Sequence, residues 1–255
     1  MALTYDLSLE GHVALVTGAA RNLPAVVATE FAAAGAAVAL NDVAAEREIQ
    51  KVAEAIKGKG GKAAVFMADV SRRDQVEQMV ARVTETLGTI DILVNGVGPF
   101  AIAPFKELPE EEWTRVMDAN LKAIYLLTRL VAPGMMEKGW GRIINISAGS
   151  ADICNHSVYG LAKSAIRFLT QSLALELGPA ITVNAISPGQ IAESAPAISE
   201  YDPTFVERAV KHTPTGRLVT RREIARMMVF ICSPIFDSVT GETIKMDGGW
   251  SIPRW

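Results

Sequence analysis

The first apolar run of the chain leads into a helix through Val16-Thr17-Gly18-Ala19-Ala20-Arg21-Asn22-Leu23-Pro24. Residues 12–16 are short and largely apolar, which is typical of a buried strand, and residues 24–34 have helical periodicity. Gly18 provides the backbone freedom that a tight turn between these elements needs. We therefore expect a strand, a turn and a helix at the start of the chain.

The same alternation of short apolar runs and longer helical segments continues to the end of the chain. Further candidate strands are residues 37–40, 63–67, 90–94, 141–146, 181–186 and 242–246. Candidate helices are residues 46–57, 73–87, 111–131, 157–177 and 223–231. Nearly continuous apolar strands separated by amphipathic helices indicate an α/β fold, in which helices cover both faces of a parallel sheet.

No linker or repeat interrupts this pattern, so we expect residues 1–255 to form a single domain. The longest stretch without clear periodicity is residues 190–219. A segment of this length in a compact domain is typically a binding loop or a lid. We expect it to cover the substrate.

Composition argues against several classes of protein. Of the 255 residues, 49% are hydrophobic and 21% charged, and the net charge is −3, which gives no electrostatic reason to expect nucleic acid or an anionic membrane as partner. The first residues lack a signal-peptide pattern and the apolar stretches are too short to span a bilayer, so we expect a cytoplasmic protein. The two cysteines, Cys154 and Cys232, predict neither a disulfide framework nor a metal site.

The turn after the first strand is a candidate dinucleotide site. The amides and dipole at a helix N-terminus attract a pyrophosphate, although only Gly18 remains of the usual glycines and an ordinary strand–helix turn fits as well. Asp42 lies 24 residues after Gly18, at the end of the second strand. Its carboxylate either binds the adenosine ribose and repels a 2′-phosphate, or caps a helix. Arg21 either pairs with a 2′-phosphate or stays solvated, and the balance favours NAD over NADP.

Tyr159 and Lys163 lie in the segment Tyr159-Gly160-Leu161-Ala162-Lys163, and residues four apart share one face of a helix. An ammonium beside a phenol favours the phenolate, so we expect the pKa of Tyr159 to fall toward the neutral range. Such a tyrosine acts as a general acid/base at neutral pH. The spacing also arises by chance, and its meaning depends on its surroundings.

Several further segments follow one another along the chain. They are Thr17-Gly18, Asp42, Asp69-Val70, Asn95-Gly96-Val97-Gly98, Asn120, Tyr159 with Lys163, Asn184, Pro188-Gly189, Pro214-x-Gly216-Arg217, and Thr240-Gly241 followed by Asp247-Gly248-Gly249. In order and spacing this set resembles the short-chain dehydrogenase/reductase family over nearly the whole chain. The resemblance implies a doubly wound Rossmann fold with a parallel seven-stranded sheet in the order 3-2-1-4-5-6-7. It also implies a homotetramer assembled through residues 111–131 and 157–177.

The resemblance further implies a chemistry, which is hydride transfer between a nicotinamide and a small-molecule secondary alcohol or ketone. Tyr159 would be the general acid/base, Lys163 would lower its pKa and hold the nicotinamide ribose, and Asn120 would orient a water that links Lys163 to solvent. The implied cofactor-binding residues are Gly18, Arg21, Asn22, Leu23, Asp42, Asp69, Val70, Asn95, Gly96, Tyr159, Lys163, Pro188, Gly189 and Ile191. Within that set, Asp69 and Val70 would contact the adenine. Pro188 to Ile191 would lie beside the nicotinamide.

Two departures from the family's pattern concern the turn and the substrate oxygen. Asn22 and Pro24 replace two glycines, which predicts a bulkier turn with fewer free amides. Ala148 stands where the family has a serine that binds the substrate oxygen, and the loop after it looks two residues short. One possibility is that Ser147 or Ser150 takes this role, and of the two we expect Ser147 to be the catalytic serine. The other possibility is that the hydrogen-bond donor to the substrate oxygen is absent.

A third departure lies after Pro188-Gly189, where Glu193 replaces a threonine that binds the nicotinamide carboxamide. Either the Glu193 carboxylate accepts a hydrogen bond from the carboxamide nitrogen, or Ser194 takes the threonine's role. His156, three residues before Tyr159, is either a second acid/base group or a surface or pocket-wall residue, and we favour the second interpretation. The departures leave one alternative open, a divergent member that binds a nucleotide or ligand with little dehydrogenase turnover. A halohydrin dehalogenase is disfavoured, because those enzymes pair the tyrosine with arginine and this chain has Lys163.

Overall fold

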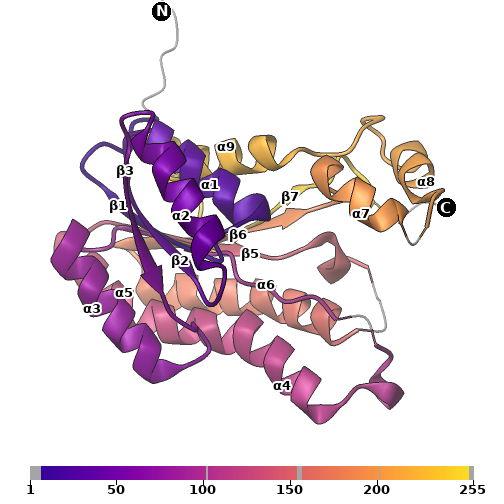
Figure 1. The fold of residues 1–255 in the computed structure, drawn as a ribbon, viewed down its shortest axis with the longest axis horizontal. Helices are drawn as coiled ribbons and strands as arrows, with labels where there is room; N and C mark the ends of the chain where they lie inside the picture. Colours follow the sequence, from indigo (N-terminus) through magenta and orange to yellow (C-terminus); the bar gives the residue numbers. More distant parts are fainter. Residues whose placement is uncertain (1–6, 102, 154–156, 201, 253–255) are drawn as a thin grey trace, which may run out of the picture.

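The computed structural model of the chain describes residues 7–101, 103–153, 157–200 and 202–252. Its centre is a parallel seven-stranded sheet in the order β3-β2-β1-β4-β5-β6-β7 (Figure 1). The strands are β1 (Val13–Thr17), β2 (Ala37–Asp42), β3 (Lys62–Met67), β4 (Ile92–Asn95), β5 (Gly141–Ile146), β6 (Ile181–Pro188) and β7 (Thr243–Met246). The expected doubly wound Rossmann fold and its strand order are confirmed.

Helices cover both faces of the sheet, because successive side chains of each strand point to opposite faces. On β1, Ala14 and Val16 belong to one apolar cluster, whereas Val13 and Leu15 belong to the other. The first cluster includes buried side chains of α1 (Asn22–Ala33), α2 (Glu46–Lys57) and α9 (Arg221–Ile231). The second includes those of α3 (Arg73–Leu87), α5 (Ala123–Lys138) and α6 (Val158–Leu177) (Figure 1).

The strand order reverses at the centre of the sheet, where β1 pairs with β2 on one side and with β4 on the other. Connections from these strands leave the carboxyl edge in opposite directions, which opens a crevice there. The turn after β1 and the loops after β4, β5 and β6 all begin at this edge. The fold therefore brings segments that are far apart in the sequence to one place.

The expected single helix over residues 111–131 is wrong. The structure has α4 (Glu110–Met117), one π-helical turn (Asp118–Lys122) and then α5, which continues to Lys138 through Pro133. A π turn inserts an extra residue into the helical repeat, so the apolar spacing that extends across it gives no sign of the break. The chain leaves α5 at Gly139, whose φ of 68° lies in the left-handed region that favours glycine.

Residues 190–219 are more regular than their sequence predicts. They contain a 3₁₀ turn (Ala192–Ser194) and two short helices, α7 (Ala195–Ser199) and α8 (Phe205–Lys211), and Ile191 pairs with Val219 in an isolated parallel bridge. These helices of five and seven residues are too short to show clear periodicity. Ala195 of α7, Ala209 of α8 and Leu218, which follows them, form one small buried apolar cluster. Across the described ranges, no helix combines the length and apolar character needed to cross a bilayer.

Candidate active site

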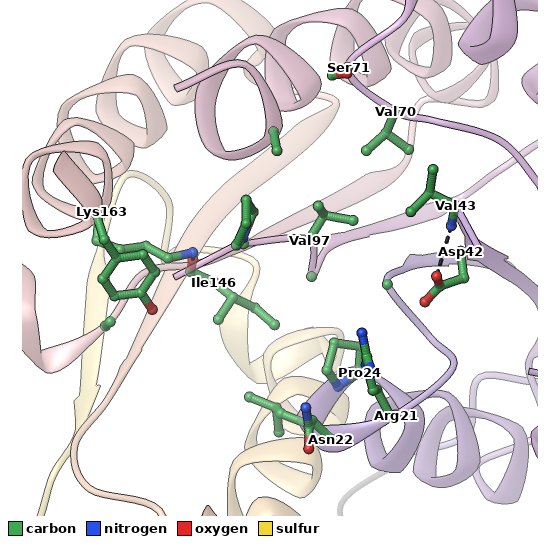
Figure 2. Close-up of a pocket in the computed structure, with 18 of the residues that line it drawn as sticks. Arg21, Asn22, Pro24, Asp42, Val43, Val70, Ser71, Val97, Ile146 and Lys163 are labelled. Carbon is green, nitrogen blue, oxygen red and sulfur yellow. Dashed lines mark hydrogen bonds between the residues drawn. The ribbon is translucent and has the colours of Figure 1, made fainter. Parts of the chain in front are cut away.

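A cavity of about 780 Å³ opens at the carboxyl edge of the sheet, around the point where the strand order reverses. Figure 2 shows its two ends, with Lys163 and Ile146 at one and Asp42 and Val43 at the other. The predicted site residues that line it are Gly18, Arg21, Asn22, Leu23, Asp42, Asp69, Val70, Gly96, Ser147, Tyr159, Lys163, Pro188, Gly189 and Ile191. Of the predicted set, Asn95 and Asn120 lie behind this lining.

The turn between β1 and α1 adopts its shape without the glycines expected in the family. Gly18 and Asn22 both have positive φ, of 69° and 55°, which asparagine tolerates better than most residues. Pro24 packs against Gly96, where an added Cβ would lie 2.8 Å from the Pro24 ring. No side chain caps the N-terminus of α1, and Arg21 takes the N-cap position with extended backbone. The helix start therefore keeps amides available for an anion, although Pro24 contributes none.

The Asp42 carboxylate holds the two turns that follow β1 and β2. Its Oδ1 accepts backbone hydrogen bonds from Val43 at 2.8 Å, Ala44 at 3.3 Å and Ala45 at 3.4 Å. Its Oδ2 accepts from the amide of Ala20 at 3.4 Å, which ties the turn after β2 to the turn after β1. The bonds of Oδ1 hold the turn before α2, whose N-cap is Ala45 and which has no side-chain cap among the described residues, so Asp42 does not cap the helix. The same carboxylate lines the cavity and is half-buried, so it also presents negative charge there.

The wall beside Asp42 is built by the loop after β3. Oδ1 of Asp69 accepts hydrogen bonds from the amide and hydroxyl of Ser71, at 2.9 and 2.7 Å, and the amide of Asp69 donates to Gln75. These bonds fix the direction in which the loop leaves the strand. Val70 and Val43 line the end of the cavity at Asp42, as Figure 2 shows. This end is an apolar slot flanked by carboxylates.

Lys163 and Tyr159 occupy the opposite end, and their protonation differs from the sequence expectation. The Nζ of Lys163 donates to the carbonyl of Ile146 at 2.7 Å and lies 5.5 Å from the centre of the Tyr159 ring. Burial raises the pKa of Tyr159 to about 12 and lowers the pKa of Lys163 to about 7. The expected fall in the pKa of Tyr159 is wrong for this arrangement, because both groups are desolvated and the amine is bonded to a backbone carbonyl.

Asn120 lies behind this end of the cavity, on the π-helical turn. Its Nδ2 donates to the carbonyls of Val116 at 2.9 Å and Pro99 at 3.4 Å, and its buried Oδ1 has no hydrogen-bond partner within the described part of the chain. A Cβ added at Gly98 would lie 2.7 Å from Lys163 Nζ and 3.0 Å from Asn120 Oδ1. The unpartnered Oδ1 of Asn120 and the amine of Lys163 therefore lie near each other, and the lack of a side chain at Gly98 leaves space for both.

The serines after β5 differ in what they offer the cavity. Ser147 lines it but is 2% exposed, and its hydroxyl donates to the carbonyl of Lys163 at 2.9 Å. In this arrangement Ser147 presents an acceptor to the cavity, not a free proton. The Ser150 hydroxyl is buried without a partner among the described residues, and Ser150 is not part of the lining. Ala148, at the expected serine position, does line the cavity.

Three expected contacts are not found. Asn95 does not line the cavity, because its Nδ2 donates at 2.8 Å to Asn145, which in turn bonds to α6. Both carboxylate oxygens of Glu193 accept from the amide of Arg221 at 3.1 Å, and the Arg221 guanidinium donates to Ser194. Glu193 and Ser194 therefore anchor the start of α9, and neither lines the cavity. His156 falls outside the described residues.

The structure adds contacts to this site that the spacing of residues does not predict. Phe100 packs edge-on against Tyr159, with ring centroids 4.9 Å apart and planes at 71°, and it is 64% exposed. Thr114, Arg115 and Asp118 bring the end of α4 to the lining. No spacing rule links these positions to the strand ends. Within the described ranges, no three His, Cys, Asp or Glu side chains come together as a group suited to a metal ion.

Comparison with known proteins gives this arrangement a family. A family model described as enoyl-(acyl carrier protein) reductase matches residues 18–251. A short-chain type dehydrogenase/reductase from Mycobacterium marinum is 33% identical and superposes with a TM-score of 0.87, covering 97% of this chain and 98% of that one. The chain belongs to the short-chain dehydrogenase/reductase family.

Other relatives of this short-chain dehydrogenase/reductase are similar over nearly their whole length. The 3-oxoacyl-(acyl-carrier-protein) reductase FabG of Thermotoga maritima is 34% identical, with 96% of this chain and 100% of FabG covered. A gluconate 5-dehydrogenase from Burkholderia cenocepacia, solved with NADP and tartrate, is 29% identical, covers 98% of both chains and has a TM-score of 0.91. The short-chain dehydrogenase/reductase family consists of oxidoreductases that bind a nicotinamide cofactor.

Proposed function

We propose that the protein is an NAD(H)-dependent oxidoreductase that transfers hydride between the nicotinamide and a secondary alcohol or ketone, with Tyr159 as general acid/base. One observation carries the proposal. A single cavity has Tyr159 and Lys163 at one end and the Asp42 carboxylate at the other, with the uncapped start of α1 between them (Figure 2). A dinucleotide has a reactive ring, a pyrophosphate and a ribose in that same order.

The chain's residues fit the cofactor that the family uses. The uncapped amides of α1 suit the pyrophosphate. Gly18 and Gly96 carry no side chain that would cover the backbone there. At Gly96 a side chain would clash with Pro24 and Thr17. The slot beside Val43 and Val70 suits the adenine. Asp42 would accept from the ribose hydroxyls and oppose a 2′-phosphate, which supports NAD over NADP.

When bound, the nicotinamide supplies the hydride donor or acceptor, and the chain's residues manage the proton. Tyr159 takes the hydroxyl proton in oxidation and returns it in reduction. An ammonium at Lys163 would favour the phenolate, and the unpartnered Oδ1 of Asn120 is placed to accept from a water that joins Lys163 to solvent. Ser147 would orient the substrate oxygen beside Tyr159. Pro188, Gly189 and Ile191 form the wall where the nicotinamide would rest.

The substrate would enter beside Phe100, and residues 190–219 would act as its lid within a single domain of 255 residues. Exposed apolar side chains also line α5 and α6, among them Tyr125 at 46%, Phe168 at 74% and Leu175 at 89% exposure. Such side chains on two long helices support the homotetramer implied by the resemblance. Light scattering coupled to size exclusion would report one subunit if this assembly does not form.

Titration with NADH and with NADPH, followed by calorimetry, tests the cofactor assignment. We expect NADH to bind more tightly than NADPH and a panel of secondary alcohols and ketones to show turnover by NADH absorbance. Tyr159→Phe serves as the matched control, since it removes only the phenolic oxygen. It is expected to keep the NADH affinity and to lose about 10²–10⁴ in kcat. Absence of NADH and NADPH binding would overturn the proposal and favour the alternative of a divergent binding protein.

A further inference from the structure

Asp152 is a buried carboxylate beside the cavity that the proposed chemistry does not use. Its side chain is 3% exposed. It follows the short turn Gly149–Ala151, between Ala148 in the cavity wall and the start of α6, where Tyr159 lies. A buried carboxylate needs opposite charge and hydrogen bonds to offset its desolvation, and three partners supply them here.

These partners come from three different elements. Oδ1 of Asp152 lies 2.9 Å from Nη1 of Arg167 on α6 and 2.8 Å from Nζ of Lys245 on β7. Oδ2 accepts from the hydroxyl of Ser187 on β6 at 3.0 Å. Ser187 and Lys245 are register partners across β6 and β7, so one carboxylate is bonded to a cross-strand pair and to the helix that carries Tyr159.

The bonds of Asp152 act on the cavity wall through short connections. Ser187 directly precedes Pro188 and Gly189, both in the lining. The loop residue Gly149 packs against the same wall, where an added Cβ would lie 3.3 Å from the Pro188 carbonyl. Fixing Asp152 therefore fixes the loop after β5 relative to Pro188 and Gly189.

We propose that Asp152 is a positioning residue, whose carboxylate clamps residues 147–152 after β5 against β6 and β7 and, through Arg167 of α6, sets where Tyr159 stands relative to the Pro188–Gly189 wall. The catalytic part of this inference rests on the proposed function. Arg167 and Lys245 share one carboxylate oxygen, so removal of its charge leaves two cations facing each other without compensation. The loop would then separate from the strands, while the cofactor residues on β1, β2 and β3 would stay in place.

The test compares Asp152→Asn with Asp91→Asn. Asp91 is an equally buried carboxylate, 2% exposed, that pairs with Lys138 at 2.7 Å and accepts from the amide of Val13. It precedes β4, so it lies at the opposite edge of the sheet from the cavity. Hydrogen exchange measured by mass spectrometry on peptides covering residues 147–163 reads the loop directly and requires no turnover.

We expect Asp152→Asn to accelerate exchange in these peptides at least tenfold, to lower kcat at least tenfold, and to leave the NADH dissociation constant within twofold. Asp91→Asn is expected to leave exchange in these peptides and kcat unchanged, and Asp152→Glu to recover part of the loss in kcat. Unchanged loop exchange in Asp152→Asn, or equal losses in kcat for both asparagine variants, would overturn the clamp.

Two further variants keep the inference testable if Asp152→Asn does not fold. Lys245→Met and Ser187→Ala each remove one bond and leave the carboxylate paired with Arg167. Each is expected to accelerate exchange in the same peptides by a smaller factor, and no acceleration in either would refute the clamp. Wild-type protein that neither binds NADH nor turns over any substrate would defeat the proposed function, whereas the exchange measurement would still decide whether Asp152 holds the loop.

Discussion

Lys163 donates its Nζ hydrogen bond to the carbonyl oxygen of Ile146, at 2.7 Å. This bond joins the helix that carries the candidate acid/base to the end of β5, across 17 residues of sequence. The same amine lies over the Tyr159 ring, 5.5 Å from its centre. Tyr159 and Lys163 are neighbours on one helical face, but the hydrogen bond of the Lys163 amine is made to the end of β5.

Burial of Lys163 predicts a pH-dependent gain in stability when its amine is removed. The folded-state pKa of about 7 lies below the unfolded value of 10.5, because burial desolvates the charged amine. This desolvation lowers the free energy of unfolding by its full amount below pH 7, and the effect disappears as pH rises toward 10.5. Lys163→Met is therefore expected to be more stable than wild type at pH 6.5, with the difference shrinking by pH 9.5. Urea unfolding at the two pH values measures it, and a difference independent of pH would show that the amine is not desolvated.

Asp42→Ala is expected to change the cofactor preference. Loss of the carboxylate removes an acceptor for the ribose and the repulsion of a 2′-phosphate, so the ratio of NADP to NAD affinity should rise at least tenfold. The variant also loses the acceptor for the amides of Val43 to Ala45, which should cost about 1 kcal/mol of unfolding free energy. Calorimetric titration with both cofactors gives the ratio. An equal loss of affinity for both would mean that the residue acts only by holding the turn before α2.

Gly98→Ala is expected to damage turnover more than stability. The added methyl would lie 2.7 Å from Lys163 Nζ and 3.0 Å from Asn120 Oδ1, so the amine must shift from the place where it would support Tyr159. We expect kcat to fall at least tenfold. Gly58→Ala is the control. It lies at the end of α2, away from the cavity, and its methyl would meet only the backbone oxygens of Glu54 at 3.2 Å and Ala55 at 3.9 Å. Equal kcat values for the two variants would contradict the proposed role of Lys163.

Ser147→Ala and Ser150→Ala distinguish the two candidate hydroxyls. Ser147 lines the cavity, so its removal is expected to lower kcat by roughly 10²-fold, as loss of one positioned polar group does. Ser150 does not line the cavity, and Ser150→Ala should stay within about threefold of wild type. Steady-state rates with the best secondary alcohol of the panel, whose hydroxyl can donate to Ser147, supply the comparison. A larger loss in Ser150→Ala would reverse the assignment.

Much of the site was predictable because it depends on the ends of strands. Gly18 and Asp42 were expected at one site from their positions after the first two strands, and the resemblance implied that Asp69, Gly96 and Pro188 join them. All five line one cavity, because the carboxyl ends of parallel strands meet at one edge of the sheet. The side chain of Asn95 bonds to Asn145 and does not line the cavity, so its cofactor role stays a prediction. The contact of Phe100 with Tyr159 could not be predicted from residue spacing, since it depends on the path of a loop.

Local periodicity along the chain is enough to predict the succession of strands and helices and the shared helical face of Tyr159 and Lys163. What those side chains contact depends on how the elements pack together. Ile146, Gly98 and Asn120 reach Lys163 from other elements, and the depth of burial sets the direction of the pKa of Tyr159. Periodicity fixes which face a residue occupies, whereas solvation and hydrogen bonding depend on segments that are distant in the sequence.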